Sequence, residues 1–267
     1  MKKKIIYPLL ENAFNKSDIS IARQVVNSKQ FTMSKITKNF ENKFAKYLGC
    51  KYAVMVNSGS SANLLSVFVS KYAYNIKNGD EAIIPSLCWS TSLWPLVQAG
   101  LKPVFVDVNL SDYNSCLDEI VKKITKKTKI IMLVHVLGTS LNIEKLQKKI
   151  KKKKIVIIED TCESLGSKFK DKYLGSFGNF GTFSFYYSHQ ITCGEGGMIV
   201  TNSKKNYDLL KIMRAHGWDR DLSKNKNKNF NFINMGFNLR PLEISAALAH
   251  NQFKRLKKFS DTREKNR

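Results

Sequence analysis

Residues 155–160 read Ile-Val-Ile-Ile-Glu-Asp, an apolar run that ends in two carboxylates. The first four positions are all apolar, rather than alternately apolar and polar. This pattern is typical of a strand buried on both faces of a parallel sheet. Such sheets bind ligands beyond the carboxyl ends of their strands. Asp160 directly follows the predicted strand Ile155–Glu159 and is therefore a candidate functional residue.

Similar apolar runs alternate with amphipathic helical patterns from about residue 50 onward. Strands are predicted at Tyr52–Val56, Glu81–Pro85, Pro103–Val108, Ile130–Val136 and Ile155–Glu159. Helices are predicted between them at Ser60–Tyr74, Thr91–Gln98, Leu117–Ile124 and Ile143–Ile150. Outside this core, helices are predicted at Asp18–Val26 with Ser17 as cap, Ile36–Leu48, Lys204–Arg214, and Pro241–Phe259 with proline in the first turn. The alternation predicts an α/β fold with a mostly parallel central sheet flanked by helices.

The composition is that of a globular enzyme with an excess of lysine. The 267 residues are 43% hydrophobic, and 45 basic residues against 21 acidic residues give a net charge of +24. A charge of this size is compatible with nucleic-acid binding. No nucleic-acid motif accompanies it, however, and Lys151–Lys154 lie between a predicted helix and a predicted strand. We interpret the charge as a solvated surface and expect no nucleic-acid partner.

The cysteine content indicates a reduced protein without a structural metal. The five cysteines are Cys50, Cys88, Cys116, Cys162 and Cys193. They are odd in number, widely spaced and include no Cys-x-x-Cys pair. The apolar stretch in Met1–Leu10 is short and broken by Pro8, so a signal peptide is not predicted. We expect a cytoplasmic protein that binds neither metal nor membrane.

Four segments contain candidate site residues, each with a plainer structural explanation. Asn57–Asn63 joins a strand to a helix, and a phosphate site and a simple helix cap are equally favoured there. Trp89 could stack on an aromatic ligand or be an ordinary core residue. Asp160 could pair with a protonated pyridine or cap a helix. His189, shortly after Gly181–Phe185, could move protons near neutral pH or simply be packed or exposed.

The order and spacing of these segments resemble the nucleotide-sugar aminotransferase family of pyridoxal phosphate (PLP) fold type I. The matching landmarks are Asn57–Asn63, Pro85–Trp89, Phe105–Val108, Glu159–Gly166, Gly178–Phe185, Glu195–Gly197, Arg214–Trp218 and Gly236–Glu243. The resemblance covers the chain from its first residues to its last. It implies the PLP-binding large domain of that fold, and a homodimer in which each subunit completes its neighbour's site.

The resemblance assigns cofactor contacts residue by residue. The positions that match cofactor-binding residues of the family are Gly59, Ser60, Trp89, Asp160, Glu163, Ser184 and Asn238. Of these, Asp160 would pair with the pyridine nitrogen, and Trp89 would stack on the ring. Gly59, Ser60 and Ser184 would hold the phosphate, and Asn238 would reach it from the neighbouring subunit. Glu163 would be a polar residue facing the cofactor.

His189 stands where the family has the lysine that holds the cofactor as a Schiff base, five residues after Ser184. No lysine lies between Lys172 and Lys204 to replace it. A subgroup of the family with this histidine comprises the 3-dehydratases of nucleotide-linked 4-keto-6-deoxy sugars. The resemblance therefore implies a PLP/PMP-dependent lyase with His189 as its catalytic residue, where PMP is pyridoxamine phosphate.

Further expectations concern the ligands of such an enzyme. The cofactor would be bound non-covalently, glutamate would be the amino donor, and GDP-4-keto-6-deoxymannose would be the substrate. The products would be deoxysugars such as colitose for lipopolysaccharide O-antigen. Other histidine-bearing relatives use an iron–sulfur cluster, which needs cysteines downstream of the histidine. No cysteine follows Cys193, so no iron–sulfur cluster is expected.

Two alternatives stay open beside the dehydratase: a sugar aminotransferase and a truncated remnant without catalysis. Loss of the lysine argues against the aminotransferase. The remnant is considered because family members continue into a small C-terminal domain that the chain lacks. We expect an N-terminal arm and helix at 1–35, the PLP-binding large domain at 36–250, and at 251–267 the start of a helix leading to that domain.

Some positions depart from the family pattern. Gln190 stands where these dehydratases usually have a second histidine, and Lys29 and Ser34 stand where family members usually have glycine. His135 follows the aminotransferase pattern. These departures bear on the subgroup and the sugar more than on the fold.

Overall fold

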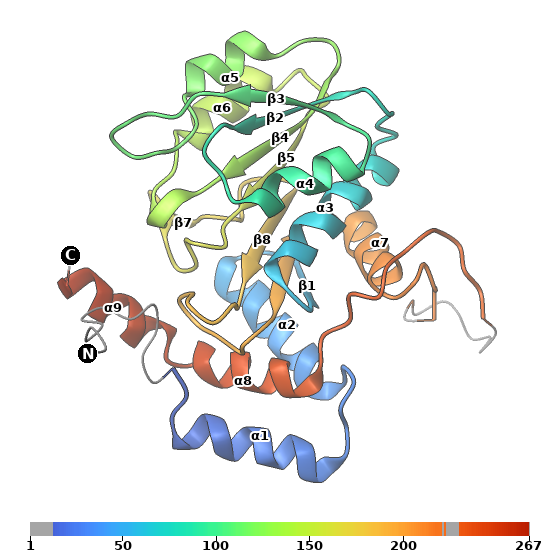
Figure 1. Cartoon of the computed structure of the whole chain (residues 1–267), viewed down its shortest axis with the longest axis vertical. Helices are drawn as coiled ribbons and strands as arrows, with labels where there is room; N and C mark the ends of the chain where they lie inside the picture. The colour runs from blue at the N-terminus through green and yellow to red at the C-terminus, as the bar shows by residue number, and fades with distance from the viewer. Residues whose placement is uncertain (1–12, 221, 223–229, 267) are drawn as a thin grey trace, which may run out of the picture.

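A seven-stranded sheet forms the centre of the computed structural model, which describes residues 13–220, 222 and 230–266 (Figure 1). In order across the sheet, the strands are β1 (Tyr52–Val56), β9 (Gly197–Thr201), β8 (Phe180–Ser184), β5 (Val156–Asp160), β4 (Thr128–Val134), β2 (Glu81–Pro85) and β3 (Lys102–Val106). A separate hairpin pairs β6 (Lys168–Phe169) with β7 (Lys172–Tyr173). The predicted α/β class is confirmed, and each predicted strand lies within two residues of its expected bounds.

The sheet is parallel except at one strand. β2, β3, β4, β5 and β8 pair in parallel, whereas β9 pairs antiparallel with both β8 and β1. β8 and β9 are additional to the predicted strands, because Gly181 and Thr182 interrupt the apolar pattern of β8. In the parallel pair of β5 and β8, Asp160 lies opposite Thr182. The carboxyl ends of these two strands therefore meet at one edge of the sheet.

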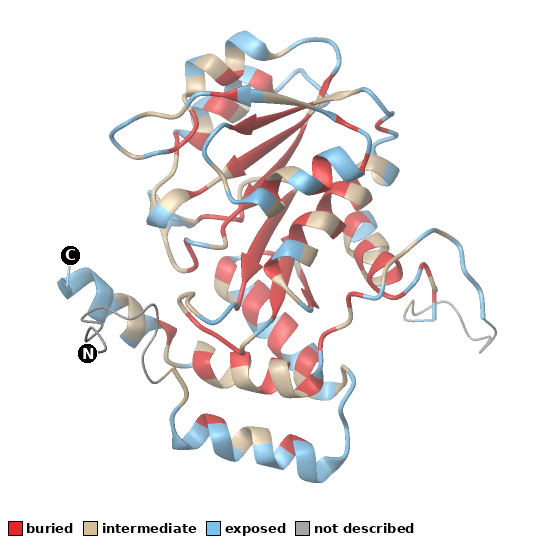
Figure 2. Cartoon of the chain, in the orientation of Figure 1, coloured by how far each residue is buried: buried red, intermediate tan, exposed pale blue. Residues whose placement is uncertain are grey.

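Helices cover both faces of the sheet (Figure 1). One face packs against α3 (Gly59–Ala73), α4 (Ser90–Gln98) and α7 (Lys204–Arg214). The other face packs against α2 (Lys35–Leu48), α8 (Glu243–Phe253), α5 (Leu117–Lys123) and α6 (Ile143–Ile150). Helix α1 (Lys16–Ser28) lies against α8, outside these layers. The molecule is thus a three-layer α/β domain in which the inner strands are buried, the edge strand β3 is partly exposed, and the outer helix faces are exposed (Figure 2).

Two-sided burial explains why the strand sequences are continuously apolar. In β1, Val54 packs into the core with α3, while the next residue, Met55, packs into the core with α2. In β4, Met132 and Leu133 divide between the two faces in the same way. All four side chains are at most 1% exposed. Burying each of them contributes about 1.5–3 kcal/mol, so neither face tolerates a polar residue at little cost.

Two helix predictions are wrong at their ends. Helix α1 is capped by Asn15, not by Ser17: Asn15 Oδ1 accepts from the backbone N–H of Asp18, and Asp18 Oδ2 accepts from that of Asn15. The predicted helix Pro241–Phe259 is two helices, α8 and α9 (Leu256–Asn266). Its proline lies before the first turn, because Leu242 is extended and pairs with Thr32.

Glu243 holds the start of α2 against the start of α8. Its Oε2 accepts from the backbone N–H of Ser34 at 2.7 Å and from the hydroxyl of Thr37 at 2.6 Å. Its Oε1 accepts from the backbone N–H of Ile36 at 2.7 Å. Ser34, the N-cap of α2, makes no side-chain capping bond of its own. A carboxylate distant in sequence therefore satisfies the amides at this helix start, where negative charge is also favoured by the helix dipole.

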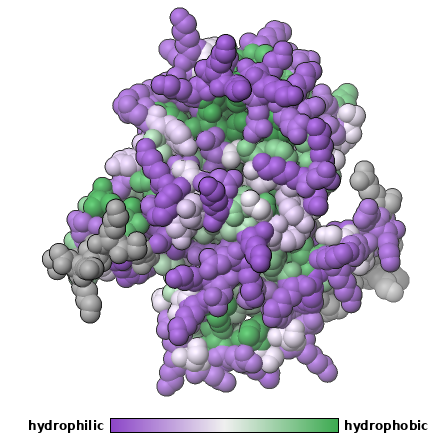
Figure 3. Space-filling view, turned by 180° about the vertical axis from the view of Figure 1, so that it is seen from behind, coloured by the Kyte–Doolittle hydropathy of each residue, from purple (hydrophilic) through white to green (hydrophobic). Residues whose placement is uncertain are grey.

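Hydrophilic side chains cover most of the face seen in Figure 3. The predicted solvated run Lys151–Lys154 is confirmed as exposed. Within residues 13–220, 222 and 230–266, no helix is both long and apolar enough to cross a bilayer. The proposed domain boundaries stay predictions, and residues 1–12 of the predicted N-terminal arm and residue 267 lie outside the described part of the chain.

Candidate active site

Asp160 lies at the carboxyl end of β5 and is 5% exposed. Its Oδ2 accepts hydrogen bonds of 2.7 Å from Asn63 Nδ2 on α3 and from Ser92 Oγ on α4. Its Oδ1 accepts one from the backbone N–H of Cys162 at 3.2 Å. In the described residues, no ion pair involves this carboxylate. Asp160 is therefore a buried carboxylate whose described partners are neutral donors, and it can accept a further hydrogen bond from a cationic donor.

Asn63 fixes the direction of the Asp160 carboxylate. The Asn63 oxygen accepts from Thr182 Oγ1 at 2.6 Å, so its nitrogen must face Asp160. Neither Asn63 nor Ser92 was predicted as a site residue from the sequence. Asn63 ends the Asn57–Asn63 turn, and Ser92 lies three residues after Trp89, so each is close to a predicted residue. Polar residues in the first two turns of helices that follow parallel strands were the usable signal.

His189 lies in the turn that follows β8, close to Asp160. Its ring packs edge-on against Tyr186 with the centroids 6.0 Å apart, and its backbone N–H donates to the Tyr186 carbonyl at 3.1 Å. Burial lowers the pKa of His189 below its ordinary value, and the Asp160 carboxylate acts in the opposite direction. The imidazole is thus mainly neutral at pH 7, within electrostatic reach of a buried negative charge.

The N-terminus of α3 and the end of β8 approach each other closely. A Cβ added at Gly59 would lie 2.4 Å from Ser184 Cβ, so only glycine fits there without movement. Ser60 is exposed and donates to Thr91 Oγ1 at 3.2 Å. Ser184 Oγ accepts from the backbone N–H of Tyr186 at 3.2 Å, which leaves its own hydrogen available. The start of α3 is capped by Ser58, whose Oγ accepts from the backbone N–H of Ser61 at 3.0 Å. The structure therefore brings Gly59, Ser60 and Ser184 to the same edge as Asp160, beside a helix start of the kind that suits an anion.

The other predicted cofactor residues lie at the surface. Trp89 precedes α4 and is 73% exposed, so the alternative of an ordinary core residue is wrong. Glu163 is exposed, and its Oε2 accepts from the backbone N–H of Leu137 at 3.3 Å. Asn238 is exposed and accepts from Arg240 Nε at 3.2 Å. Their roles toward a cofactor stay predictions.

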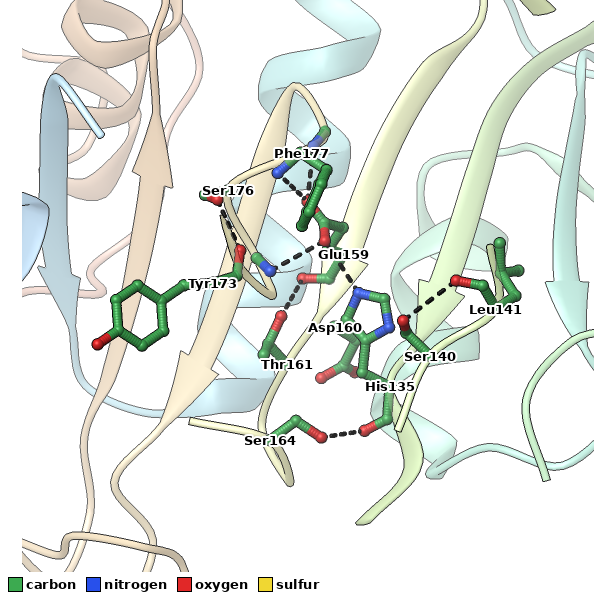
Figure 4. Close-up of polar contacts among 12 residues, drawn as sticks. His135, Ser140, Leu141, Glu159, Asp160, Thr161, Ser164, Tyr173, Ser176 and Phe177 are labelled. Atoms are coloured by element: carbon green, nitrogen blue, oxygen red, sulfur yellow. Dashed lines mark hydrogen bonds and ion pairs between the residues drawn. The ribbon is translucent and has the colours of Figure 1, made fainter. Parts of the chain in front are cut away.

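Glu159, the neighbour of Asp160, faces away from the site and organises the loop before β8 (Figure 4). It is fully buried. Its Oε1 accepts from the backbone N–H groups of Phe177 and Gly178 at 2.7 and 2.6 Å. Its Oε2 contacts Gly175 N and His135 Nε2, both at 2.9 Å. Successive residues of β5 thus serve a structural cluster on one face and the candidate site on the other.

The sequence matches the model of the DegT/DnrJ/EryC1/StrS aminotransferase family over residues 12–267. The chain belongs to this family. Two similar curated members are GDP-4-keto-6-deoxy-D-mannose 3-dehydratases. The protein of Escherichia coli O55:H7 is 42% identical over 98% of this chain and 71% of its own length. That of Yersinia pseudotuberculosis is 38% identical over 100% of this chain and 71% of its own length. The family resemblance inferred from the sequence motifs is confirmed.

Solved structures of family members match the fold closely. The E. coli GDP-4-keto-6-deoxy-D-mannose-3-dehydratase with bound hydrated PLP superposes with a TM-score of 0.94, at 40% identity over 98% of this chain and 71% of that one. A histidine-to-asparagine variant of such a dehydratase with bound GDP-perosamine gives the same TM-score over 97% of this chain and 71% of that one, at 40% identity. A variant with histidine-to-lysine and serine-to-asparagine changes gives 0.92 at 38% identity, over 96% of this chain and 71% of that one.

Proposed function

We propose that the chain is a PLP/PMP-dependent 3-dehydratase of a nucleotide-linked 4-keto-6-deoxy sugar, with GDP-4-keto-6-deoxymannose as substrate. The observation that carries the proposal is a histidine, His189, in the turn after β8, the strand that pairs with β5 and its buried Asp160 carboxylate. The names of the curated relatives support it. The substitutions in the solved variants support it too, because this chain contains a single Ser-His dipeptide, Ser188–His189.

The residues at the site fit a pyridoxal-type cofactor. Among the described residues, the hydrogen-bond partners of Asp160 are all neutral. A protonated pyridine nitrogen would therefore provide a positive partner for this carboxylate. Gly59, Ser60 and Ser184 would hold the phosphate at the start of α3. Exposed Trp89 would stack on the ring, and Glu163 would face the cofactor from the loop after β5. When bound, PMP supplies a primary amine for the 4-keto group and an electron-withdrawing pyridinium ring.

His189 would move the protons of the reaction. Its lowered pKa keeps the imidazole neutral at pH 7, so it begins as a proton acceptor. With the cofactor and sugar bound, His189 would accept a proton from the methylene carbon of the cofactor and would donate a proton to the hydroxyl that leaves carbon 3 of the sugar. Histidine cannot form a Schiff base, and no lysine lies between Lys172 and Lys204. The cofactor would therefore be held without a covalent bond to the chain.

The overall reaction balances with glutamate as amino donor and reductant. Substrate and glutamate give the 3-deoxy-4-keto sugar, 2-oxoglutarate and ammonia, and the two electrons that replace the hydroxyl by hydrogen come from glutamate. The test is incubation of the chain with PLP, glutamate and GDP-4-keto-6-deoxymannose. Equal yields of the three products are expected. A stable 4-amino sugar without ammonia would overturn the proposal in favour of transamination.

Matched variants test the role of His189. His189→Asn should abolish turnover while PLP still binds. His189→Lys should allow borohydride to fix PLP covalently to the protein, whereas the unchanged chain should not be labelled. Borohydride labelling of the unchanged chain would contradict non-covalent binding. Bound cofactor without any turnover of the sugar would favour the non-catalytic alternative.

An aminotransferase is the second candidate, because GDP-perosamine synthase of E. coli O157:H7 is 36% identical over 83% of this chain and 58% of its own length. The absent lysine weighs against it.

We further propose a homodimer in which exposed Asn238 reaches the phosphate in the neighbouring subunit. The free cysteines support a reduced, cytoplasmic location. Residues 36–250 would form the PLP-binding domain.

A further inference from the structure

Gln190 connects the turn that contains His189 with the loop that follows Asp160. Its Nε2 donates a hydrogen bond of 2.5 Å to the backbone oxygen of Glu163. The Glu163 side chain in turn accepts from the backbone N–H of Leu137 at 3.3 Å. These residues lie in the loops after β8, β5 and β4, whose carboxyl ends form one edge of the sheet. The contacts therefore join three loops beside the candidate site.

The Gln190 side-chain amide has one possible orientation, and only its nitrogen makes a hydrogen bond. Turning the amide over would set its oxygen against the Glu163 oxygen, so the nitrogen must face Glu163. The Gln190 oxygen, Oε1, is buried and has no hydrogen-bond partner in the described part of the chain. A buried amide oxygen without a partner costs free energy. The position of the side chain therefore satisfies the hydrogen bond from Nε2 to Glu163 and leaves Oε1 without one.

In the part of the chain that the structure describes, the ring contact and the backbone hydrogen bond of His189 lie within its own turn. Its ring packs against Tyr186, and its backbone N–H donates to the Tyr186 carbonyl. Neither contact sets the distance between this turn and β5. The Gln190 bond does so, because Glu163 lies three residues after Asp160. The amide also does not titrate, so this connection is the same at every pH.

We propose that Gln190 is a positioning residue for His189, and that its amide fastens the catalytic turn to the loop after β5. The inference rests on the proposed function, in which His189 transfers protons beside Asp160. Among the described residues, the Asp160 carboxylate on β5 acts electrostatically on His189, and Tyr186 packs against its ring from the same turn. Residues after Gln190 are anchored separately, because Ile191 is buried in the core and the Thr192 N–H donates to Gln252 Oε1. Without the Gln190 bond, the part of the turn before Ile191 would be free to move away from the loop after β5, and the imidazole would become more exposed.

The test compares Gln190→Met with Gln147→Met in the full chain. Both glutamines are half-buried, and each donates a hydrogen bond from Nε2 to a backbone oxygen. The partner of Gln147 is Phe177, which lies in the loop before β8. The first measurement is an NMR titration of the His189 ring in cofactor-free protein, assigned with His189→Asn. Gln190→Met should raise the pKa of His189 toward its ordinary value, because burial is the main cause of its lowering. Gln147→Met should leave it unchanged.

The second measurement is steady-state turnover. Gln190→Met should lower kcat roughly 10- to 100-fold, because a misplaced base is costly, with KM unchanged. Gln190→Asn keeps the amide but is one methylene shorter, and should behave like Gln190→Met. An unchanged His189 titration in both Gln190 variants would overturn the positioning role. If the His189 titration shifts in the Gln190 variants but the unsubstituted protein has no dehydratase activity, the positioning role of Gln190 is supported and the proposed function is overturned.

Discussion

Replacing Glu159 with glutamine should destabilise the protein by about 3 kcal/mol. The buried carboxylate makes four contacts, with Phe177 N, Gly178 N, Gly175 N and His135 Nε2. Glutamine has one acceptor oxygen, so keeping the first two contacts turns its NH₂ group toward the N–H of Gly175. One bond to a charged group, worth about 1.5–3 kcal/mol, is then lost, and the two bonds that remain become weaker neutral ones. His135 can adapt by changing its tautomer.

The assay is equilibrium unfolding in urea without cofactor, so that ligand binding does not add to the stability. Glu144→Gln is the control, because Glu144 forms a surface ion pair with Lys170 and its loss should leave the transition midpoint unchanged. If Glu159→Gln unfolds within about 0.5 kcal/mol of the unchanged protein, the reasoning fails, because the Gly175 amide would then be satisfied by water.

Three further predictions concern the site. Asp160→Asn removes a buried charge and should weaken PLP binding about 10- to 100-fold in an absorbance titration. The control Asp171→Asn changes an exposed carboxylate and should leave PLP affinity unchanged. If Asp160→Asn bound PLP as tightly as the unchanged protein, pairing with the pyridine nitrogen would be ruled out. Gly59→Ala sets a Cβ 2.4 Å from Ser184 Cβ and should also lower PLP affinity, and unchanged binding would mean that the turn opens freely. The acid limb of the pH–kcat/KM profile, which reports the free enzyme, should lie below about 6.5, because the rate requires neutral His189 and burial lowers its pKa. A limb above that value would mean that Asp160 outweighs burial.

The fold was predictable where the local pattern agrees with the tertiary environment. β2 and α6 have the predicted bounds, because their apolar residues are continuous in the strand and periodic in the helix. Pro241–Phe259 was wrong for a tertiary reason. Leu242 pairs with Thr32, and the N–H of Glu243 donates to Phe31, so contacts more than 200 residues apart decide where α8 begins. No local pattern contains that information.

The candidate site was predictable in part. Asp160 could be found because the end of a parallel strand is a general location for ligands. The side chains that orient it could not be assigned a role, because Asn63 and Ser92 are 97 and 68 residues away in the sequence. His189 was identified by resemblance, whereas its neutral state depends on burial, which only the fold determines.

The position of β9 between β1 and β8 has a consequence for synthesis of the protein. β1 hydrogen-bonds within the sheet only to β9, as far as the described residues show, and β9 is made after the whole intervening stretch 57–196. Until then β1 has apolar side chains and an open backbone edge, which favours pairing with other chains. A nascent chain therefore needs about 200 residues outside the ribosome before its first sheet strand has a partner, and protection of Tyr52–Val56 by a chaperone would matter most in that interval.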